Sequence, residues 1–239
     1  MTKEDAIVGP TFPCSRRRRA IASYRAFALW RQRTREFLFL IALLVIAQPA
    51  AADEATCGTL RNAYGPYDYR SATARQLQLV EDYHFTPPVE ELKHGKSGLT
   101  IGGDIDYTLR AIPNHYRALV AMMNLGFKGK KDPPPGAGFP VECYFDRAIR
   151  FRPEDGAVRT IYGIYLFRRG KMTDAITQFE TAEKLGDNSG NLHYNAGLVY
   201  FELGDYDKAV AHAKQAAELG FALPGLRDKL TKIGKWPAE

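Results

Sequence analysis

An internal repeat of 34 residues constrains the fold of this chain more than any other feature of its sequence. Residues 156–189, GAVRTIYGIYLFRRGKMTDAITQFETAEKLGDNS, align without a gap with residues 190–223, GNLHYNAGLVYFELGDYDKAVAHAKQAAELGFAL. In the second copy, apolar residues recur at helical spacing before the turn LGDYDKA, which opens another helix. A repeat of this length cannot bury its own apolar face, so neighbouring copies must stack. The small residues coincide: Gly163 with Gly197, Gly170 with Gly204, Ala175 with Ala209, and Ala182 with Ala216.

These positions resemble the tetratricopeptide repeat family, whose 34-residue signature is W-x2-L-G-x2-Y, then A-x3-F, then P. The Trp and the last Pro are missing from both copies. The resemblance implies an all-α solenoid of antiparallel helix pairs, with about three repeats and a C-terminal capping helix. The matching positions are Tyr162, Gly163, Leu166, Ala175 and Phe179 in one copy, and Ala196, Gly197, Tyr200, Ala209, Ala213 and Ala216 in the other.

An upstream copy, residues 112–155, carries an insertion. His115 and Tyr116 align with His193 and Tyr194, but the residue equivalent to His115 in the next copy is Arg159, which lies ten residues later than the period requires. The extra residues fall within KGKKDPPPGAG. We interpret this stretch as a lengthened turn between two helices of one repeat, stiffened by polyproline geometry. The alternatives are a linker between domains and a proline-rich docking motif.

The predicted repeat array spans residues 112–239, including a capping helix at its C-terminal end. The residues before the array do not match the repeat. Residues 224–239 predict the capping helix, because Leu226, Leu230 and Ile233 form one apolar stripe. Residues 53–111 do not match the repeat and predict an irregular, Tyr-rich segment that packs on the repeats. Within it we expect short helices in ATARQLQLVEDY and TPPVEELKHG, and a cluster of turns in GKSGLTIGGD.

Residues 1–52 have the pattern of a secretory signal peptide: an arginine-rich start, an 11-residue apolar run from Phe37 to Ala47, and a small-residue cleavage site before Asp53. The alternative is an uncleaved anchor, which would be the one contact of the chain with a membrane. The net charge of +6 lies entirely in this leader, since the remaining residues carry 24 basic and 24 acidic side chains. That balance argues against nucleic-acid binding, which requires a basic surface. We therefore expect an exported, periplasmic protein.

Two cysteines remain after the leader. Cys143 lies two residues from both Val141 and Phe145, which should face inward, so we expect Cys143 on the outer face of its helix. In an oxidising compartment, an even count favours a disulfide with Cys57 that fastens the N-terminal segment to the first repeat. The alternative is two free thiols.

The resemblance also implies a partner-binding groove, because the first helix of each pair lines the concave face of such arrays. We expect this groove to be filled either by a partner or by residues 53–111, since an uncovered apolar groove would be a large exposed hydrophobic patch. Of the polar residues that grip a C-terminal carboxylate in some family members, the sequence offers Asn191 and Arg168. The mapped positions are Tyr116, Val120, Met123, Thr160, Ile164, Phe167, Arg168, Asn191, Tyr194, Leu198 and Phe201.

Sequence motifs for catalysis, metals and cofactors are missing. The five histidines show no HExxH or Cys/His spacing, and there is no CxxC, CxxCH, GxSxG or phosphate-binding loop. His115 and His193 occupy the Trp position of the repeat and are expected to pack in the core. Asp104 and Asp106 form an acid pair without an identifiable base. We expect no enzyme activity, no metal and no cofactor.

The function expected from these observations is that of a noncatalytic scaffold or adaptor in the cell envelope, which binds another protein or peptide through the groove. Two alternatives stay open. The chain could be an enzyme-associated or hydrolase-like protein with a site in residues 60–110, which a convergent pair of Asp104 and Asp106 in a deep pocket would favour. It could also be a self-occluded structural protein without an available groove.

Overall fold

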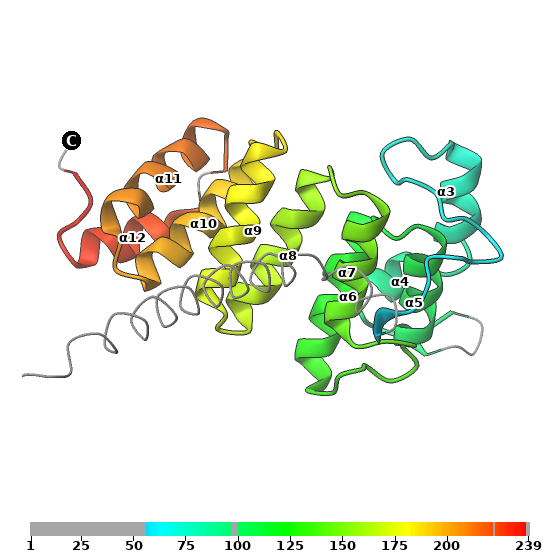
Figure 1. The fold of residues 1–239 in the computed structure, drawn as a ribbon. Coiled ribbons are helices and arrows are strands. Elements are labelled where there is room, and N and C mark those ends of the chain that lie inside the picture. The colour runs from blue at the N-terminus through cyan, green and yellow to red at the C-terminus, as the bar shows by residue number, and fades with distance from the viewer. Residues whose placement is uncertain (1–55, 97–99, 222, 238–239) are drawn as a thin grey trace, which may run out of the picture. The chain divides into compact units, whose positions relative to one another are not determined.

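The computed structural model describes residues 56–96, 100–221 and 223–237. The described residues are all-α, as expected, and contain no strand. The predicted signal peptide and its cleavage site lie outside them. The helices are α3 (Ala74–Glu81), α4 (Pro87–Glu90), α5 (Ile101–Ala111), α6 (Tyr116–Gly129), α7 (Val141–Phe151), α8 (Gly156–Arg168), α9 (Met172–Lys184), α10 (Gly190–Glu202), α11 (Tyr206–Glu218) and α12 (Pro224–Lys232) (Figure 1).

The 34-residue repeats are the hairpins α8–α9 and α10–α11, each an antiparallel pair. Their turns place Gly170 and Gly204 at φ of 77° and 80°, a conformation that residues with a Cβ rarely adopt. The small residues allow the two helices of a pair to approach closely: a Cβ added at Gly163 would lie 2.6 Å from the Phe179 ring. Thus the repeat signature encodes both the turn and the contact between its helices.

The first repeat consists of α6 and α7, and the ten-residue insertion lies in the loop between them. The loop is largely exposed, but Pro134 is buried and Phe139 is half-buried. The backbone of Gly138 donates a hydrogen bond to Asp106 Oδ1 at 3.2 Å, so the loop is fastened to α5 as well as being solvated. It is a connection inside one packed unit, since the two helices that it joins, α6 and α7, pack against each other.

The N-terminal segment is more regular than expected. The two short helices are present as α3 and α4, but the expected turn cluster GKSGLTIGGD leads into α5, a helix of 11 residues. The expectation of turns was therefore wrong for residues 101–104, which form the first part of α5. Thr100 caps α5, since its side chain accepts a hydrogen bond from Gly103 N, and Ile105 and Leu109 are buried in the core. Burial of this apolar face outweighs the low helix propensity of two adjacent glycines.

A disulfide joins Cys57 to Cys143, with a Cα–Cα distance of 5.1 Å. Cys143 is buried, because the N-terminal segment covers it, so the expectation of an accessible outer position was wrong. Beside it, the buried Arg147 donates hydrogen bonds from Nη1 to the carbonyl oxygens of Cys57 at 3.0 Å and Thr59 at 2.6 Å. The segment is thus held on α7 by covalent and polar contacts.

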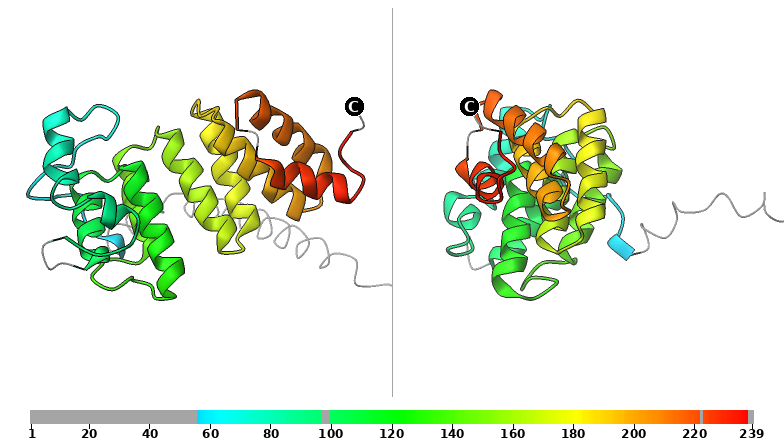
Figure 2. Two further views of the ribbon diagram at one scale, coloured as in Figure 1. Left: turned by 180° about the vertical axis from the view of Figure 1, so that it is seen from behind. Right: turned by 90° about the vertical axis from the view of Figure 1, so that its left-hand side faces the viewer.

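One apolar core runs from the N-terminal helices through α10, and a second, smaller core lies under α12. Leu226 and Leu230 of α12 are buried, as the capping-helix prediction requires, but Ile233 is exposed because the helix ends at Lys232. Helices α3 to α5 and helix α12 lie at opposite ends of the stack of hairpins (Figure 1 and Figure 2).

Candidate binding surface

The first helices of the three repeats, α6, α8 and α10, pack in order against one another. Where they meet lies a hollow of about 280 Å³, which we call the α6–α8–α10 hollow. It brings together three of the mapped groove residues and five others. The lining residues are Glu90, Tyr116, Arg117, Val120, Ala121, Asn124, Ile161 and Asn191.

The apolar part of the hollow comes from α6 and α8. Val120 is 37% exposed, and Ile161 contributes a mostly buried side chain. The ring of Tyr116 is half-buried, and its hydroxyl donates to the Asp155 carboxylate at 3.1 Å. Burial, together with that carboxylate, raises the pKa of Tyr116 above its usual value, so the hydroxyl stays neutral. The hydrogen bond to Asp155 holds the Tyr116 ring in place.

The polar part of the hollow is charged and hydrogen-bonded. Arg117 Nε donates to Glu90 Oε1 at 2.8 Å, and its Nη2 pairs with Glu90 Oε2. These bonds hold the pKa of the Glu90 carboxyl below its usual value. On the other side, Arg168 Nη1 donates to Asn124 Oδ1 at 2.6 Å, and Asn195 Nδ2 donates to Asn191 Oδ1 at 3.0 Å. The amides are thereby oriented before any ligand arrives.

Other mapped groove residues lie deeper. Met123 is 4% exposed and lines a separate cavity of about 310 Å³ next to Phe127 and Tyr165. Thr160 is 2% exposed and donates to Asp187 Oδ2 at 2.5 Å. Ile164 and Phe167 are half-buried against the main core. None of these four residues lines the α6–α8–α10 hollow.

Helix α12 packs against α10 and partly covers its remaining mapped positions. Tyr194, Leu198 and Phe201 are half-buried and belong to the core under α12. The Phe201 ring also lies 5.6 Å from the Tyr206 ring. Less of the mapped groove is therefore exposed on α10, because α12 covers part of these three side chains.

The described part of the N-terminal segment packs beside the hollow. Helix α4 contacts α5 and α6, and α3 contacts α5. The Tyr69 ring lies 5.1 Å from that of Tyr116, and Glu90 forms one wall. The segment therefore shapes one edge of the α6–α8–α10 hollow, between α4 and α6.

Sequence reasoning missed five lining residues. Asn124 continues the i, i+4 series of Tyr116 and Val120, and Ile161 precedes Ile164 by one turn, so extending each helical stripe would have found both. Arg117 and Ala121 follow the mapped residues directly. Glu90 comes from the N-terminal segment, and only the tertiary structure places it there.

The acid pair Asp104 and Asp106 does not converge on one site. Asp104 Oδ1 lies 3.1 Å from His84 Nδ1, and its Oδ2 accepts from Lys96 N. Asp106 accepts instead from Arg110 Nε at 2.8 Å and from the Tyr144 hydroxyl at 2.5 Å. Both carboxylates fasten neighbouring segments to α5. Side chains able to hold a metal ion gather elsewhere, where α9, α10 and α11 meet: Glu183, His193 and His212.

Over the described ranges, no helix combines the length and the apolar character needed to cross a membrane.

A family model described as tetratricopeptide repeat matches residues 142–190 and 163–224. No curated protein matches the chain. Among solved structures, a mutant of MamA is 21% identical, covering 64% of this chain and 81% of that one, with a TM-score of 0.40. A thermophilic TPR protein of Thermus thermophilus is 22% identical, covering 56% of this chain and 74% of that one, with a TM-score of 0.43.

Proposed function

Because residues 142–224 belong to the tetratricopeptide repeat family, we propose that this chain is a noncatalytic scaffold that binds a partner protein in the α6–α8–α10 hollow. Proteins built from such repeats commonly mediate contacts between proteins. The observation that carries the proposal is an apolar patch of Val120 and Ile161 surrounded by oriented polar groups. Apolar anchors within a polar rim are typical of protein interfaces.

The hollow, of about 280 Å³, has room for one side chain of a partner protein. The amides of Asn124 and Asn191 suit hydrogen bonds to a peptide backbone. We propose an apolar residue in a peptide segment as the anchor.

The location of the partner is part of the proposal. The arginine-rich leader with its apolar run and the Cys57–Cys143 disulfide both support export to an oxidising compartment, the periplasm. The partner would then be another component of the cell envelope. The alternative of a self-occluded protein is less well supported, because Val120 remains exposed beside α4.

The test compares two substitutions at equally exposed apolar positions. Val120 and Leu185 are both 37% exposed, but only Val120 lines the hollow. Val120→Glu would bury a charge against the anchor, so capture of the partner from envelope extracts should fall at least about tenfold. Leu185→Glu should leave it unchanged.

A photo-crosslinking residue at position 120 should also give a discrete adduct, whereas one at position 185 should not. Equal capture by both glutamate variants would show that the partner binds elsewhere, and absence of any captured protein with the wild type would contradict the proposal.

A further inference from the structure

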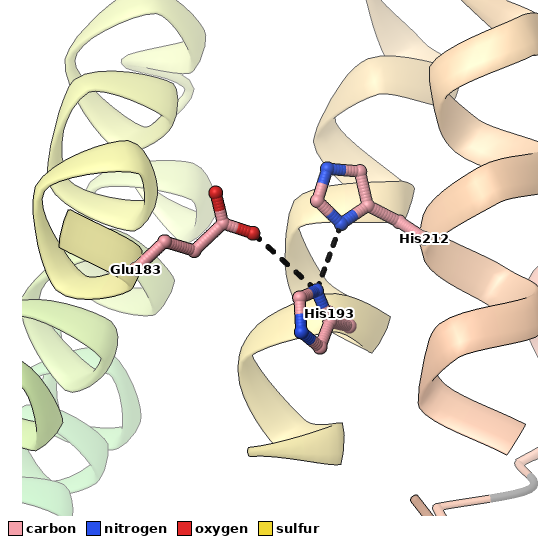
Figure 3. Close-up of side chains that lie close together, drawn as sticks. All are labelled: Glu183, His193 and His212. Atoms are coloured by element: carbon pink, nitrogen blue, oxygen red, sulfur yellow. Dashed lines mark hydrogen bonds and ion pairs between the residues drawn. The ribbon is translucent and has the colours of Figure 1, made fainter. Parts of the chain in front are cut away.

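Three side chains with metal-binding atoms converge from three successive helices: Glu183 of α9, His193 of α10 and His212 of α11 (Figure 3). His193 Nδ1 lies 3.0 Å from His212 Nδ1 and 3.4 Å from Glu183 Oε1. All three potential ligand atoms lie within 4.8 Å of one another. This cluster is separate from the α6–α8–α10 hollow, and no part of the proposed function uses it.

A hydrogen bond at Nε2, the ring nitrogen that faces away from Glu183 and His212, fixes the orientation of the His193 ring. Its Nε2 lies 2.6 Å from Asn188 Oδ1, which also accepts a hydrogen bond from Gln215 Nε2 at 3.3 Å. A carbonyl oxygen can only accept, so Nε2 carries the proton and Nδ1 of the neutral ring presents a lone pair. Histidines that bind metals are commonly held in this way by a hydrogen bond from their other nitrogen.

In the neutral ring, the lone pair of His193 Nδ1 faces two electron-rich partners. The Glu183 carboxylate is one, and His212 Nδ1 is the other (Figure 3). A single proton from His212 would satisfy one contact and leave the carboxylate against a lone pair. A cation between the three atoms would satisfy all of them.

The surroundings hold both rings in place, and the His193 ring is buried. The His212 ring also stacks on the Tyr200 ring at 5.3 Å, which limits its rotation. Two neutral imidazoles and one carboxylate are typical zinc ligands.

We propose that Glu183, His193 and His212 bind a divalent transition metal of the Zn²⁺ class, with water as a fourth ligand. In a tetrahedral site with metal–nitrogen bonds of about 2.0–2.1 Å, neighbouring ligand atoms are roughly 3.3 Å apart. The separations of 3.0 and 3.4 Å are close to this value. The Glu183 side chain is 38% exposed and is free to close the remaining gap. Nitrogen ligands favour Zn²⁺ over Mg²⁺ or Ca²⁺, which take oxygen ligands.

A metal at this position would join the two C-terminal repeats. Glu183 belongs to the repeat 156–189, whereas both histidines belong to the repeat 190–223. Since helical repeats are stabilised largely through contacts with their neighbours, a bound ion would strengthen that junction. Binding of metal should therefore be visible as increased thermal stability.

The experiment titrates Zn²⁺ alone into the full chain after removal of metals with a chelator. The wild type should take up one Zn²⁺ more than the variant His212→Gln, measured by calorimetry and by metal analysis of the purified chain. At a free Zn²⁺ concentration of about 100 times Kd, the wild-type Tm should rise by roughly 5–10 °C.

Three variants make the test specific. Glu183→Gln changes an exposed side chain, so the variant should still fold. Its affinity for Zn²⁺ should fall by more than about 10–100-fold, the loss expected when an outer-shell partner is removed. Asn188→Ala removes such a partner and should fall within that range. Glu180→Gln changes a carboxylate one turn earlier on α9 and should bind Zn²⁺ as the wild type does.

Failure of the wild type to bind Zn²⁺ would overturn the proposal. So would equal binding by the wild type, Glu183→Gln and His212→Gln, or an equal loss in Glu180→Gln. Circular dichroism of each variant without metal confirms that the chains compared are folded.

Discussion

His115 lies fully buried at the start of α6, where its ring has two roles. Its Nδ1 accepts a hydrogen bond from Ala118 N at 3.2 Å and so caps the helix, while its Nε2 contacts Glu81 Oε1 at 3.1 Å. The Phe85 ring packs on it at 4.9 Å. The sequence predicted packing at this position, and the structure adds the cap and the link to α3.

The pKa of His115 makes stability depend on pH. Burial lowers this pKa to about 4, against the opposite effect of Glu81, whereas an unfolded histidine titrates near 6.5. The unfolded chain then binds more protons as the pH falls. The contribution of His115 to stability is complete above about pH 6.5 and is progressively lost towards pH 4, by up to about 3 kcal/mol.

Urea unfolding at several pH values checks this expectation. His115→Asn keeps a side-chain acceptor for the helix cap but does not titrate. Its unfolding free energy should fall less between pH 6.5 and 4 than that of the wild type. Parallel pH profiles for the two proteins would mean that Glu81, Glu90 and Arg117, which lie around the ring, determine the acid response instead.

At the scale of elements, α5 shows how tertiary contacts override local propensity. Gly102 and Gly103 disfavour a helix in isolation. In the structure, the inserted loop passes so close to α5 that a Cβ added at Gly102 would lie 2.3 Å from Pro135 O. The glycine that weakens the helix also permits the loop to dock, so the insertion and α5 depend on each other.

Substitution of Gly102 by Val tests this close approach. The added side chain would push against backbone, which cannot rotate away, so we expect a loss of about 1–3 kcal/mol in the free energy of unfolding. Gly129→Ala is the matched control, because nothing lies within 4 Å of the added Cβ. It should be neutral or stabilising by up to about 1 kcal/mol, as alanine is the better helix former. Similar losses in both variants would show that the loop does not dock on α5.

At the scale of the whole described chain, the N-terminal segment and the first repeat form one unit. Asp68 accepts from Arg152 Nε at 2.7 Å and from Asn114 Nδ2 at 2.8 Å. The Cys57–Cys143 disulfide closes a loop across the same junction, with a sequence separation of 86. The segment is therefore an integral end of the repeat array.

Removal of the disulfide should weaken this junction more than the two C-terminal repeats. In the chain-entropy description, a loop of this size contributes at most about 4–5 kcal/mol. Limited proteolysis of a chain with Cys14→Ser, which prevents reshuffling, should show faster cleavage between residues 58 and 72 after reduction. Cleavage of α10 and α11 should change little.

The chain with Cys57→Ala and Cys143→Ala provides the control for reductant. Its cleavage should be fast from the start and should not respond to reductant. If reduction accelerated its cleavage as well, the effect would come from something other than this disulfide.

The sequence by itself determined the repeat array and its period. A turn glycine with positive φ and small residues between paired helices are local requirements, so a 34-residue pattern is enough to place α8 to α11. The period and the turns follow from spacing along the chain. The resemblance to the repeat family additionally implied that Tyr116, Val120 and Asn191 are neighbours on one face.

Only the tertiary structure decided what surrounds that array. Helix α5, the Glu90 wall of the hollow and the partial covering of α10 by α12 depend on contacts between residues distant in sequence. The meeting of Glu183 with His193 and His212 likewise depends on how two hairpins stack. A single sequence carries the period of each helix but not the register between helices, because that register is set by the packing of all side chains together.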